Sequence, residues 1–236
     1  MRRFLMLALA LGLFACFSPT PSAEEVALET DDQKVLYAVG QALARNIANL
    51  EFTAEEMVYV NAGLNEGASG GEPRIDMTVY GPMLDASMRT RMTQVTQKER
   101  DAGQAYCDSM AQEEGADKLA SGMVFRTIAQ GDGALPQPTD TVKVHYHGTL
   151  RDGTVFDSTR GKEPAQFSVG GVIPCFSEGL QKVKVGGKAK LTCPAEIAYG
   201  DRGRPGSIRP GAALTFEIEL VELIPVAAAP TSPPVP

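Results

Sequence analysis

The sequence predicts an α+β protein in which an all-α N-terminal part precedes a twisted antiparallel sheet. Apolar residues recur at helical spacing before about residue 115 and alternate with polar residues, as in half-buried strands, after it. The charge changes near the same place. Residues 24–118 carry 18 acidic and 8 basic side chains, whereas residues 119–225 carry 11 and 12. A chain of 236 residues is long enough for two domains of ordinary size.

The composition is that of a globular protein and argues against several classes of function. Hydrophobic residues make up 43% of the chain and charged residues 22%, which are ordinary values. The net charge of −7 argues against a nucleic-acid partner, because phosphate binding requires a basic face. The chain has only two histidines and no cysteine pair with zinc-type spacing. We therefore expect no metal and no cofactor.

Residues 1–23 are interpreted as an export segment. Arg2 and Arg3 precede an apolar run that is too short to span a bilayer. Two cleavage modes remain open. Leu13-Phe14-Ala15-Cys16 resembles a bacterial lipoprotein box, which would lipidate Cys16, whereas Pro21-Ser22-Ala23 suits an ordinary signal peptidase. Both modes predict the periplasm or cell envelope of a bacterium, and the first predicts an outer-membrane lipoprotein whose lipid anchor is its membrane contact.

Export implies an oxidising compartment, so the remaining cysteines are candidates for disulfides. Cys175 and Cys193 are the pair that we favour. Closing this loop would stabilise the fold by about 3 kcal/mol. The alternative is that both are small apolar residues of the core. Cys107 is then either free or paired between subunits.

Residues 24–75 predict a small helical domain. Its first helix carries an apolar stripe and begins near Asp31 or Asp32, either of which can cap it. The stripe consists of Val35, Leu36, Val39, Leu43 and Ile47. Thr53-Ala54-Glu55-Glu56 is typical of a capping box that begins a second helix, which ends before the glycine-rich turn at 67–71.

Residues 76–118 predict one long connecting helix, from about Asp76 to Gly115. Its apolar stripe runs from Tyr80 to Val95 and then gives way to charged residues. The apolar faces of the three helices are too small to form one large core, so we expect a second copy of the chain to complete it. A loosely packed monomeric bundle is the alternative.

Residues 119–225 predict a sheet domain that is large enough to fold alone. Val142, Val144 and Tyr146 alternate with polar neighbours, and similar alternation covers 188–193 and 214–220. Arg151-Asp152-Gly153 supplies a hairpin turn, and a short helix around 176–180 can cover the apolar face. Residues 226–236 form a Pro/Ala-rich tail that we expect to be disordered.

Candidate functional residues in this domain are aromatic rather than nucleophilic. His145 and His147 share a strand face but lack an evident third ligand, so we interpret them as solvent-facing. The loop from Tyr199 to Pro210 is long and glycine-rich, as binding loops on a rigid sheet often are. Seven aromatic side chains fall within one small domain, either as core or as the lining of a pocket: Phe125, Tyr146, Phe156, Phe167, Phe176, Tyr199 and Phe216.

Several segments between residues 120 and 224 resemble FKBP-type peptidyl-prolyl cis–trans isomerases, in the family's order and with its spacing. These are 144–150, 152–153, 156–158, 172–174, 178–180, 198–200, 205–208 and 214–216. The helical part resembles, more weakly, the dimerisation domain of exported bacterial members of the macrophage infectivity potentiator type. The resemblance implies an FKBP-like sheet of five or so strands wrapped around one short helix, and a homodimer joined through its N-terminal helices.

The family's functional residues carry over to this sequence position by position. Catalytic roles fall to Tyr146, Phe156, Asp157, Ile173, Phe176, Tyr199 and Phe216, and substrate-binding roles to Phe167, Val172 and Ile208. Phe176 stands where the family usually has tryptophan, so the pocket keeps an apolar floor but loses an indole N–H. By analogy, Ile173 N–H and the Tyr199 hydroxyl would bind substrate carbonyls, and Asp157 would orient the pocket wall.

The resemblance therefore implies an enzyme that accelerates rotation about X–Pro bonds in exported proteins, without a covalent step, and that assists their folding. The implied partners are proline-containing segments of unfolded proteins and macrolides of the rapamycin type. A chaperone that binds proline-containing peptides with little or no isomerase activity is the alternative, which rests on the replacement at Phe176.

Overall fold

The computed structural model describes residues 26–224. The chain divides into two units, of which the first ends at Leu43 and the second begins at Ala44. Export, lipidation at Cys16 and the C-terminal tail are predictions that lie outside the described residues. None of the described helices is both long enough and apolar enough to cross a membrane.

The first unit contains helix α1, Asp31–Ala44, except for its last residue. Its cap differs from the prediction, because Thr30 rather than an aspartate accepts the N–H of Gln33 at 3.2 Å. The Gln33 side chain in turn accepts the Thr30 N–H at 2.9 Å, so the pair forms a reciprocal cap. The helix also ends before Ile47, which the predicted stripe had included. Its apolar residues are exposed, as Leu36 at 71% illustrates.

The second unit begins with a 3₁₀ turn, Ala48–Leu50, and two helices, α2 and α3. Helix α2, Ala54–Ala68, starts with the predicted capping box between Thr53 and Glu56. It runs two residues into the predicted glycine turn. Helix α3, Met77–Met110, has 34 residues and is capped by Asp76. At 1.5 Å per residue it is about 50 Å long.

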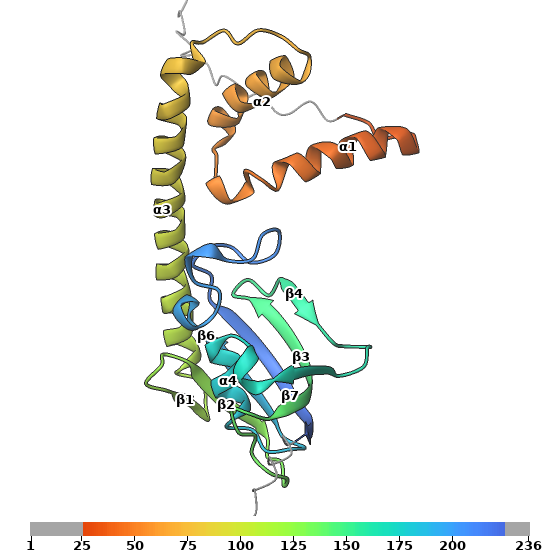
Figure 1. Ribbon diagram of the computed structural model, residues 1–236, viewed down its shortest axis with the longest axis vertical. Coiled ribbons are helices and arrows are strands. Elements are labelled where there is room, and N and C mark those ends of the chain that lie inside the picture. The colour runs from red at the N-terminus through yellow and green to blue at the C-terminus, as the bar shows by residue number, and fades with distance from the viewer. Residues whose placement is uncertain (1–25, 225–236) are drawn as a thin grey trace, which may run out of the picture. The chain divides into compact units, whose positions relative to one another are not determined.

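Seven strands form one antiparallel sheet in the order β1-β2-β6-β7-β3-β4, with β5 also paired to β3. The strands are β1 Ala116–Lys118, β2 Val124–Ala129, β3 Thr141–Leu150, β4 Val155–Ser158, β5 Ala165–Ser168, β6 Lys188–Cys193 and β7 Leu214–Ile224. The helix α4, Pro174–Leu180, lies against the sheet (Figure 1). The α+β class and the sheet around a short helix are confirmed, with more strands than the five or so expected.

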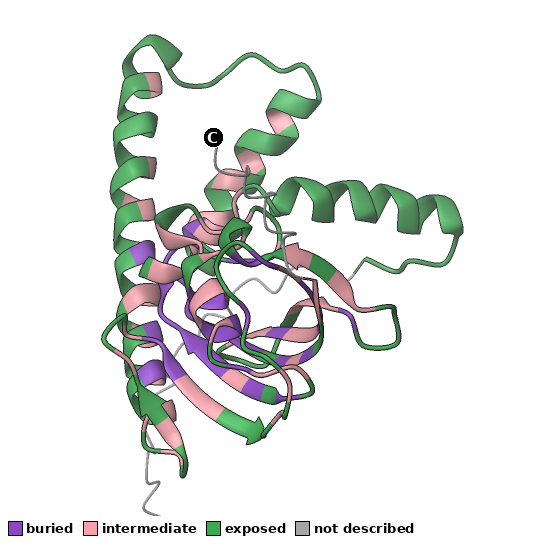
Figure 2. Ribbon diagram, turned by 60° about the horizontal axis from the view of Figure 1, so that its bottom comes forward, coloured by how far each residue is buried: buried purple, intermediate pink, exposed green. Residues whose placement is uncertain are grey.

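The hydrophobic core lies between α4 and the inner face of the sheet. Val142 and Val144 of β3 are fully buried, and so are Leu214 and Leu220 of β7. Figure 2 shows that the buried residues gather in the sheet and α4, whereas α1, α2 and the first half of α3 are mostly exposed. The period-two alternation in the sequence therefore identified the buried face correctly.

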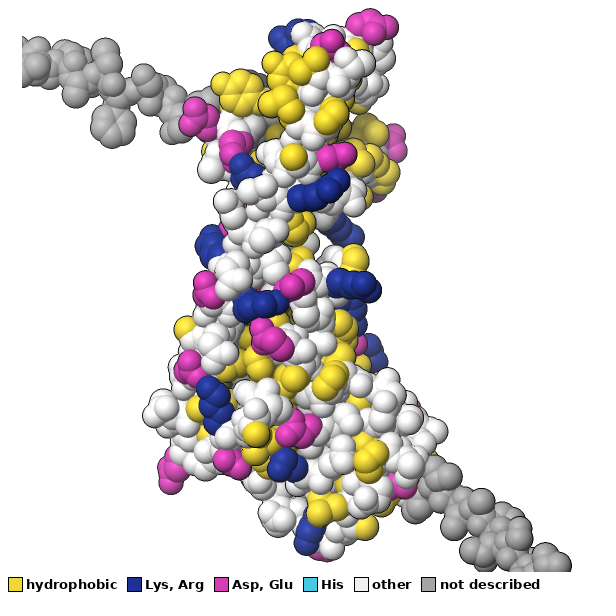
Figure 3. Space-filling view, turned by 60° about the vertical axis from the view of Figure 1, so that its left-hand side comes forward, with side chains coloured by type: hydrophobic (Ala, Val, Ile, Leu, Met, Phe, Trp, Pro, Cys, Tyr) yellow, Lys and Arg dark blue, Asp and Glu magenta, His cyan; other side chains and the backbone are white. Residues whose placement is uncertain are grey.

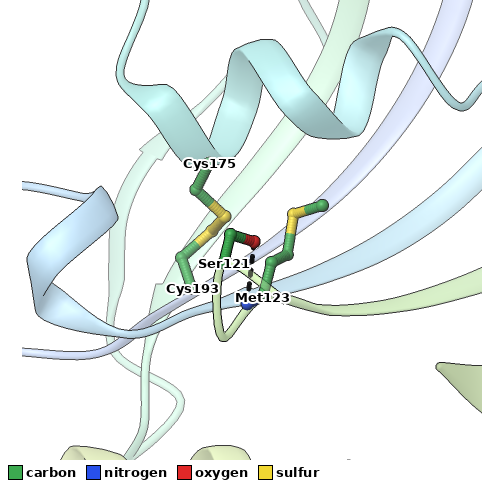
Figure 4. The surroundings of a disulfide bond; sticks show 4 residues. All are labelled: Ser121, Met123, Cys175 and Cys193. Carbon is green, nitrogen blue, oxygen red and sulfur yellow. Dashed lines mark hydrogen bonds between the residues drawn. A yellow bond between two sulfur atoms is a disulfide. The ribbon is translucent and has the colours of Figure 1, made fainter. Parts of the chain in front are cut away.

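A disulfide fastens α4 to the sheet. Cys175 of α4 and Cys193 of β6 are joined, with their Cα atoms 5.9 Å apart (Figure 4). Met123, which is fully buried, lies beside the bond. Cys107 of α3 is free and buried against Val124 and Ala213. Burial raises the pKa of its thiol to about 11, so Cys107 is protonated at neutral pH.

Candidate active site

A cavity of about 320 Å³ opens between α4 and the sheet. Its wall is assembled from strands β3, β4, β5 and β7, from the start of α4 and from the loop after β6. The lining residues are Tyr146, Phe156, Asp157, Phe167, Gly171, Val172, Ile173, Phe176, Tyr199 and Phe216. Tyr146, Phe156 and Tyr199 are only partly buried, so the aromatic residues line an accessible hollow rather than a sealed core.

Phe176 forms the floor of this cavity and the centre of its aromatic network. Its ring centroid lies 5.2 Å from that of Phe216, 5.8 Å from Phe167 and 6.0 Å from Tyr146. All three pairs meet nearly edge to face, which is a favourable arrangement for aromatic rings. Pro174 at the first turn of α4 sets the direction of this helix, and only 4% of Phe176 remains exposed. The floor is therefore apolar and almost fully enclosed by neighbouring side chains.

A glycine in β3 lets the outer wall close over the sheet. Gly148 pairs with Phe216 of β7 on one side and with Asp157 of β4 on the other. A Cβ atom at this position would lie 2.6 Å from the Phe156 ring, closer than real atoms approach. Because that atom is missing, the Phe156 ring covers β3 and meets Phe216 edge to face at 5.5 Å.

Charged groups stand at the rim of the cavity. A guanidinium Nη of Arg204 lies 3.6 Å from the Asp157 carboxylate, and another Nη donates to the carbonyl of Phe156 at 3.0 Å. Burial, together with the neighbouring Asp157 carboxylate, raises the pKa of Tyr146 to about 12. The Tyr146 phenol is therefore neutral and able to donate a hydrogen bond at any physiological pH.

Two further groups are free to bind a ligand. Ile173 precedes the first turn of α4, and no hydrogen bond in the described chain takes up its backbone N–H. Tyr199 lines the opening, and its hydroxyl makes no hydrogen bond within the described residues. An apolar floor with a few polar groups at the rim is typical of a site for a small apolar group flanked by amides.

Comparison with known proteins identifies this architecture. Residues 133–221 match the family model for FKBP-type peptidyl-prolyl cis-trans isomerase, and residues 32–127 match the model for the domain amino-terminal to it. The chain belongs to the FKBP-type peptidyl-prolyl cis-trans isomerases.

Relatives with the same two-part organisation cover most of the chain. The FKBP-type 22 kDa isomerase of Escherichia coli K12 is 38% identical, over 83% of this chain and 97% of its own length. "Outer membrane protein MIP" of Legionella longbeachae is 32% identical, over 94% of this chain and 98% of its own length. The crystal structure of FkpA from Escherichia coli, 33% identical, matches with a TM-score of 0.62 over 84% of this chain and 99% of that one.

This FKBP-type isomerase accelerates cis–trans rotation about the bond that precedes proline. Rotation is slow because it breaks amide resonance, at a barrier of about 18–20 kcal/mol. A non-covalent site lowers this barrier by binding the twisted amide more tightly than the planar one. Among the described residues that line the cavity, no nucleophile is paired with a base.

The structure brings together nearly all the site residues expected from the sequence. Nine of the ten line the cavity, and the tenth, Ile208, is 97% buried in the core cluster that also contains Phe176 and Phe216. Two contributors were missed. Gly171 contributes backbone, which leaves no mark in a side-chain pattern, and Arg204 lies in the loop that the sequence analysis had singled out without assigning its residues.

The histidines of the FKBP domain lie outside this site. His145 and His147 border a second hollow of about 430 Å³ on the outer face of the sheet, together with Glu217 and Glu219. His147 Nδ1 lies 3.0 Å from the Ser158 hydroxyl. Among the described residues, no group of three or more His, Cys, Asp or Glu side chains is placed to hold a metal ion.

Proposed function

We propose that the isomerase acts through the aromatic cavity between α4 and the sheet, with the prolyl ring packed against the rings of Phe176 and Phe216. The observation that supports this most directly is the pair of rings at 5.2 Å on a floor that is almost completely buried. A prolyl ring fits such an apolar hollow, whereas the charged groups stand only at its rim. Val172 and Phe167 complete the apolar wall.

The cavity favours the twisted amide because it withholds water from the planar form. A planar amide has greater charge separation and is stabilised by water at its carbonyl oxygen. In a cavity without water the planar amide loses this stabilisation, so the free energy of the twisted amide falls relative to that of the planar one. Ile173 N–H and the Tyr199 hydroxyl bind flanking substrate carbonyls and hold the peptide in place. Each 1.36 kcal/mol gained by the twisted state is about a tenfold gain in rate.

Asp157 acts in this proposal as an electrostatic residue of the wall rather than as a base. Its carboxylate lies 3.6 Å from the Arg204 guanidinium and helps to raise the pKa of Tyr146. It therefore fixes the direction in which both groups present their donors. No group in the cavity has to change its protonation state during the reaction.

A proline-limited refolding assay on the full chain tests the site. We expect Phe216→Ala to lower kcat/KM at least about a hundredfold, because it removes one of the two rings against which proline packs. Asp157→Ala should lower it about tenfold or more. Val155→Ala is the matched control, since Val155 lies in the same strand as Phe156 but is 50% exposed and does not line the cavity. Wild-type rates in Phe216→Ala would rule out this cavity. Rapamycin should block the wild-type protein at the same place.

We also propose that the protein works as a homodimer. In the part of the chain that the structure describes, large apolar side chains of the N-terminal helices are exposed: Val35 is 63% exposed in α1, Tyr59 75% in α2 and Met83 59% in α3. Figure 3 shows hydrophobic side chains gathered towards the N-terminal end of α3. Monomeric proteins rarely leave so many large apolar residues uncovered. A second copy would bury them, and sedimentation of the full chain tests this.

The proposed location is the bacterial cell envelope, where the enzyme would assist the folding of exported proteins. The support is the export pattern of residues 1–23, the disulfide, and the resemblance to a relative named as an outer membrane protein. Two cavities in one dimer could engage the same unfolded client, which raises the effective concentration of the second site. Cell fractionation with and without Cys16→Ser distinguishes a lipid anchor from a soluble periplasmic form.

A further inference from the structure

The loop between β6 and β7, here called the 200s loop and defined as Gly200–Gly211, connects the cavity to the long helix. Its first residue follows Tyr199, whose side chain lines the cavity. Its middle reaches β4, where Arg204 donates to the carbonyl of Phe156 at 3.0 Å. Its end returns to its beginning, because Gly211 N–H donates to the carbonyl of Gly200 at 3.0 Å. The 200s loop is therefore closed on itself, and one side of it contacts strand β4, which forms part of the cavity wall.

The other side of the 200s loop lies directly on α3. Gly211 has a φ of +79°, and a Cβ atom there would lie 2.5 Å from the carbonyl oxygen of Thr96. Thr96 is itself buried, with 8% exposed. Only a glycine allows this approach, so the sequence provides for direct contact between the loop and the helix (Figure 1).

Charged side chains reinforce this contact from the helix. The guanidinium of Arg100 forms an ion pair with Asp201 of the 200s loop, and its Nε lies 3.3 Å from Glu196 just before the loop. The preceding residue, Glu99, binds both Nε and Nη2 of Arg151, at 3.0 and 3.2 Å. Arg151 belongs to the turn that leads into β4. Adjacent residues of α3 thus hold both segments that lead to the cavity rim.

A third contact comes from the turn before α2. Glu51 has a φ of +48°, the left-handed conformation that non-glycine residues rarely adopt. Its carboxylate lies 2.8 Å from Lys98 of α3 and 3.4 Å from Arg209 of the 200s loop. Such backbone strain persists only where surrounding contacts enforce it. The turn, the helix and the loop therefore meet at one charged junction.

We propose that Arg100 is a positioning residue of the isomerase, which holds the 200s loop through Asp201 so that the Tyr199 hydroxyl stays directed at the substrate. This inference rests on the proposed role of Tyr199. It gives the long helix a part in catalysis beyond separating the domains. One exposed ion pair contributes little by itself, but Asp201 lies only two residues from Tyr199, and a loop closed at both ends transmits the restraint.

Arg100→Ala in the full chain is the test, with kcat and KM measured on a proline-containing peptide. We expect kcat/KM to fall about three- to tenfold, mainly through KM, because the Tyr199 hydroxyl binds substrate before and during rotation. Asp201→Asn should have the same effect from the loop side. Arg89→Ala is the matched control, because it removes the same charge from the same helix and Arg89 forms no ion pair within the described residues.

The double variant with Tyr199→Phe separates positioning from a general structural effect. If Arg100 acts through the Tyr199 hydroxyl, then Arg100→Ala should lower kcat/KM by less than about twofold when it is made in the Tyr199→Phe protein. The proposal would be overturned if Arg100→Ala lowered kcat/KM by the same factor in the wild type and in Tyr199→Phe. Wild-type kinetics in both Arg100→Ala and Asp201→Asn would also overturn it. An equal loss in Arg89→Ala would also overturn it. An unimpaired Tyr199→Phe variant would instead contradict the role proposed for Tyr199, which distinguishes the two failures.

Discussion

The two halves of α3 differ in how far their apolar side chains are buried. Near its C-terminal end, Gly103 and Cys107 are fully or nearly fully buried against the sheet domain, and Tyr106 meets Thr215 of β7 at 3.0 Å. Near its N-terminal end, Met83 and Leu84 are more than half exposed. Among residues 26–224, the first half packs into no hydrophobic core, whereas the second half packs against the sheet domain. The helix therefore does more than connect two domains.

The same substitution in the two regions should have very different effects. We expect Leu214→Ala, at a fully buried position of β7, to lower the free energy of unfolding of the sheet domain by about 2–5 kcal/mol. Leu84→Ala, at a position 52% exposed in the single chain, should change it by less than about 0.5 kcal/mol. Urea unfolding of the sheet domain, at a protein concentration where the chain is monomeric, measures both.

Leu84→Ala should nevertheless weaken self-association, because the exposed half of α3 is where we place the second copy. Sedimentation of the two variants completes the comparison: Leu214→Ala should leave the association constant unchanged. If Leu84→Ala sediments as the wild type does, then Leu84 is not part of the contact between copies. A fully monomeric wild type at all concentrations would contradict the dimer itself.

Removing the disulfide should be the next largest effect, and it should be confined to the sheet domain. Cys175 and Cys193 are separated by 18 residues, and closing a loop of that length stabilises a fold by about 3 kcal/mol through the unfolded chain. We expect the double variant Cys175→Ala/Cys193→Ala to lose about this much in urea unfolding and to keep its self-association. Adding a reductant to Cys107→Ala, which retains the disulfide, should reproduce the loss. No effect of either treatment would show that the bond contributes little.

The sequence predicted the sheet domain more fully than the helical one, for a physical reason. Alternation in β3 and β7 and the aromatic positions around Phe176 define a core that this chain completes by itself. The capping box at Thr53 was also predictable, because capping depends on four consecutive residues. The cap of α1 was assigned wrongly to Asp31 or Asp32, since Thr30 competes for the same role and only the backbone geometry decides between them.

What the sequence could not predict are features that depend on close approach or on long-range pairing. Gly148 and Gly211 are ordinary glycines in the sequence, yet each allows a contact that any side chain would prevent. Arg100 lies in a run of charged residues that is typical of a solvated helix, but its partner Asp201 comes from a loop 101 residues away. Ile208, assigned to the site from the family resemblance, is buried in the core cluster that also contains Phe176 and Phe216, and its role in the site stays a prediction.

The buried half of α3 should also make the fold sensitive to alkali. The pKa of Cys107 is raised from 9.0 to about 11 in the folded protein, because burial disfavours the thiolate. The contribution of the neutral thiol is therefore fully present below about pH 9 and is lost as the pH rises through 11. A shift of this size corresponds to about 2–3 kcal/mol at most. Urea unfolding between pH 8 and 11 should show a smaller decline in Cys107→Ala than in the wild type.

The smallest expected effect is that of pH on catalysis between about pH 6 and 8. The pKa of Tyr146 is raised to about 12 by burial and by Asp157, so this phenol stays protonated throughout the range. His145 and His147 line the outer hollow and do not line the cavity. We expect kcat/KM to vary less than about twofold. A change in kcat/KM near neutral pH that disappears in His145→Gln/His147→Gln would mean that the outer face of the sheet takes part in catalysis. The proposal that no group changes its protonation state during the reaction would then be wrong.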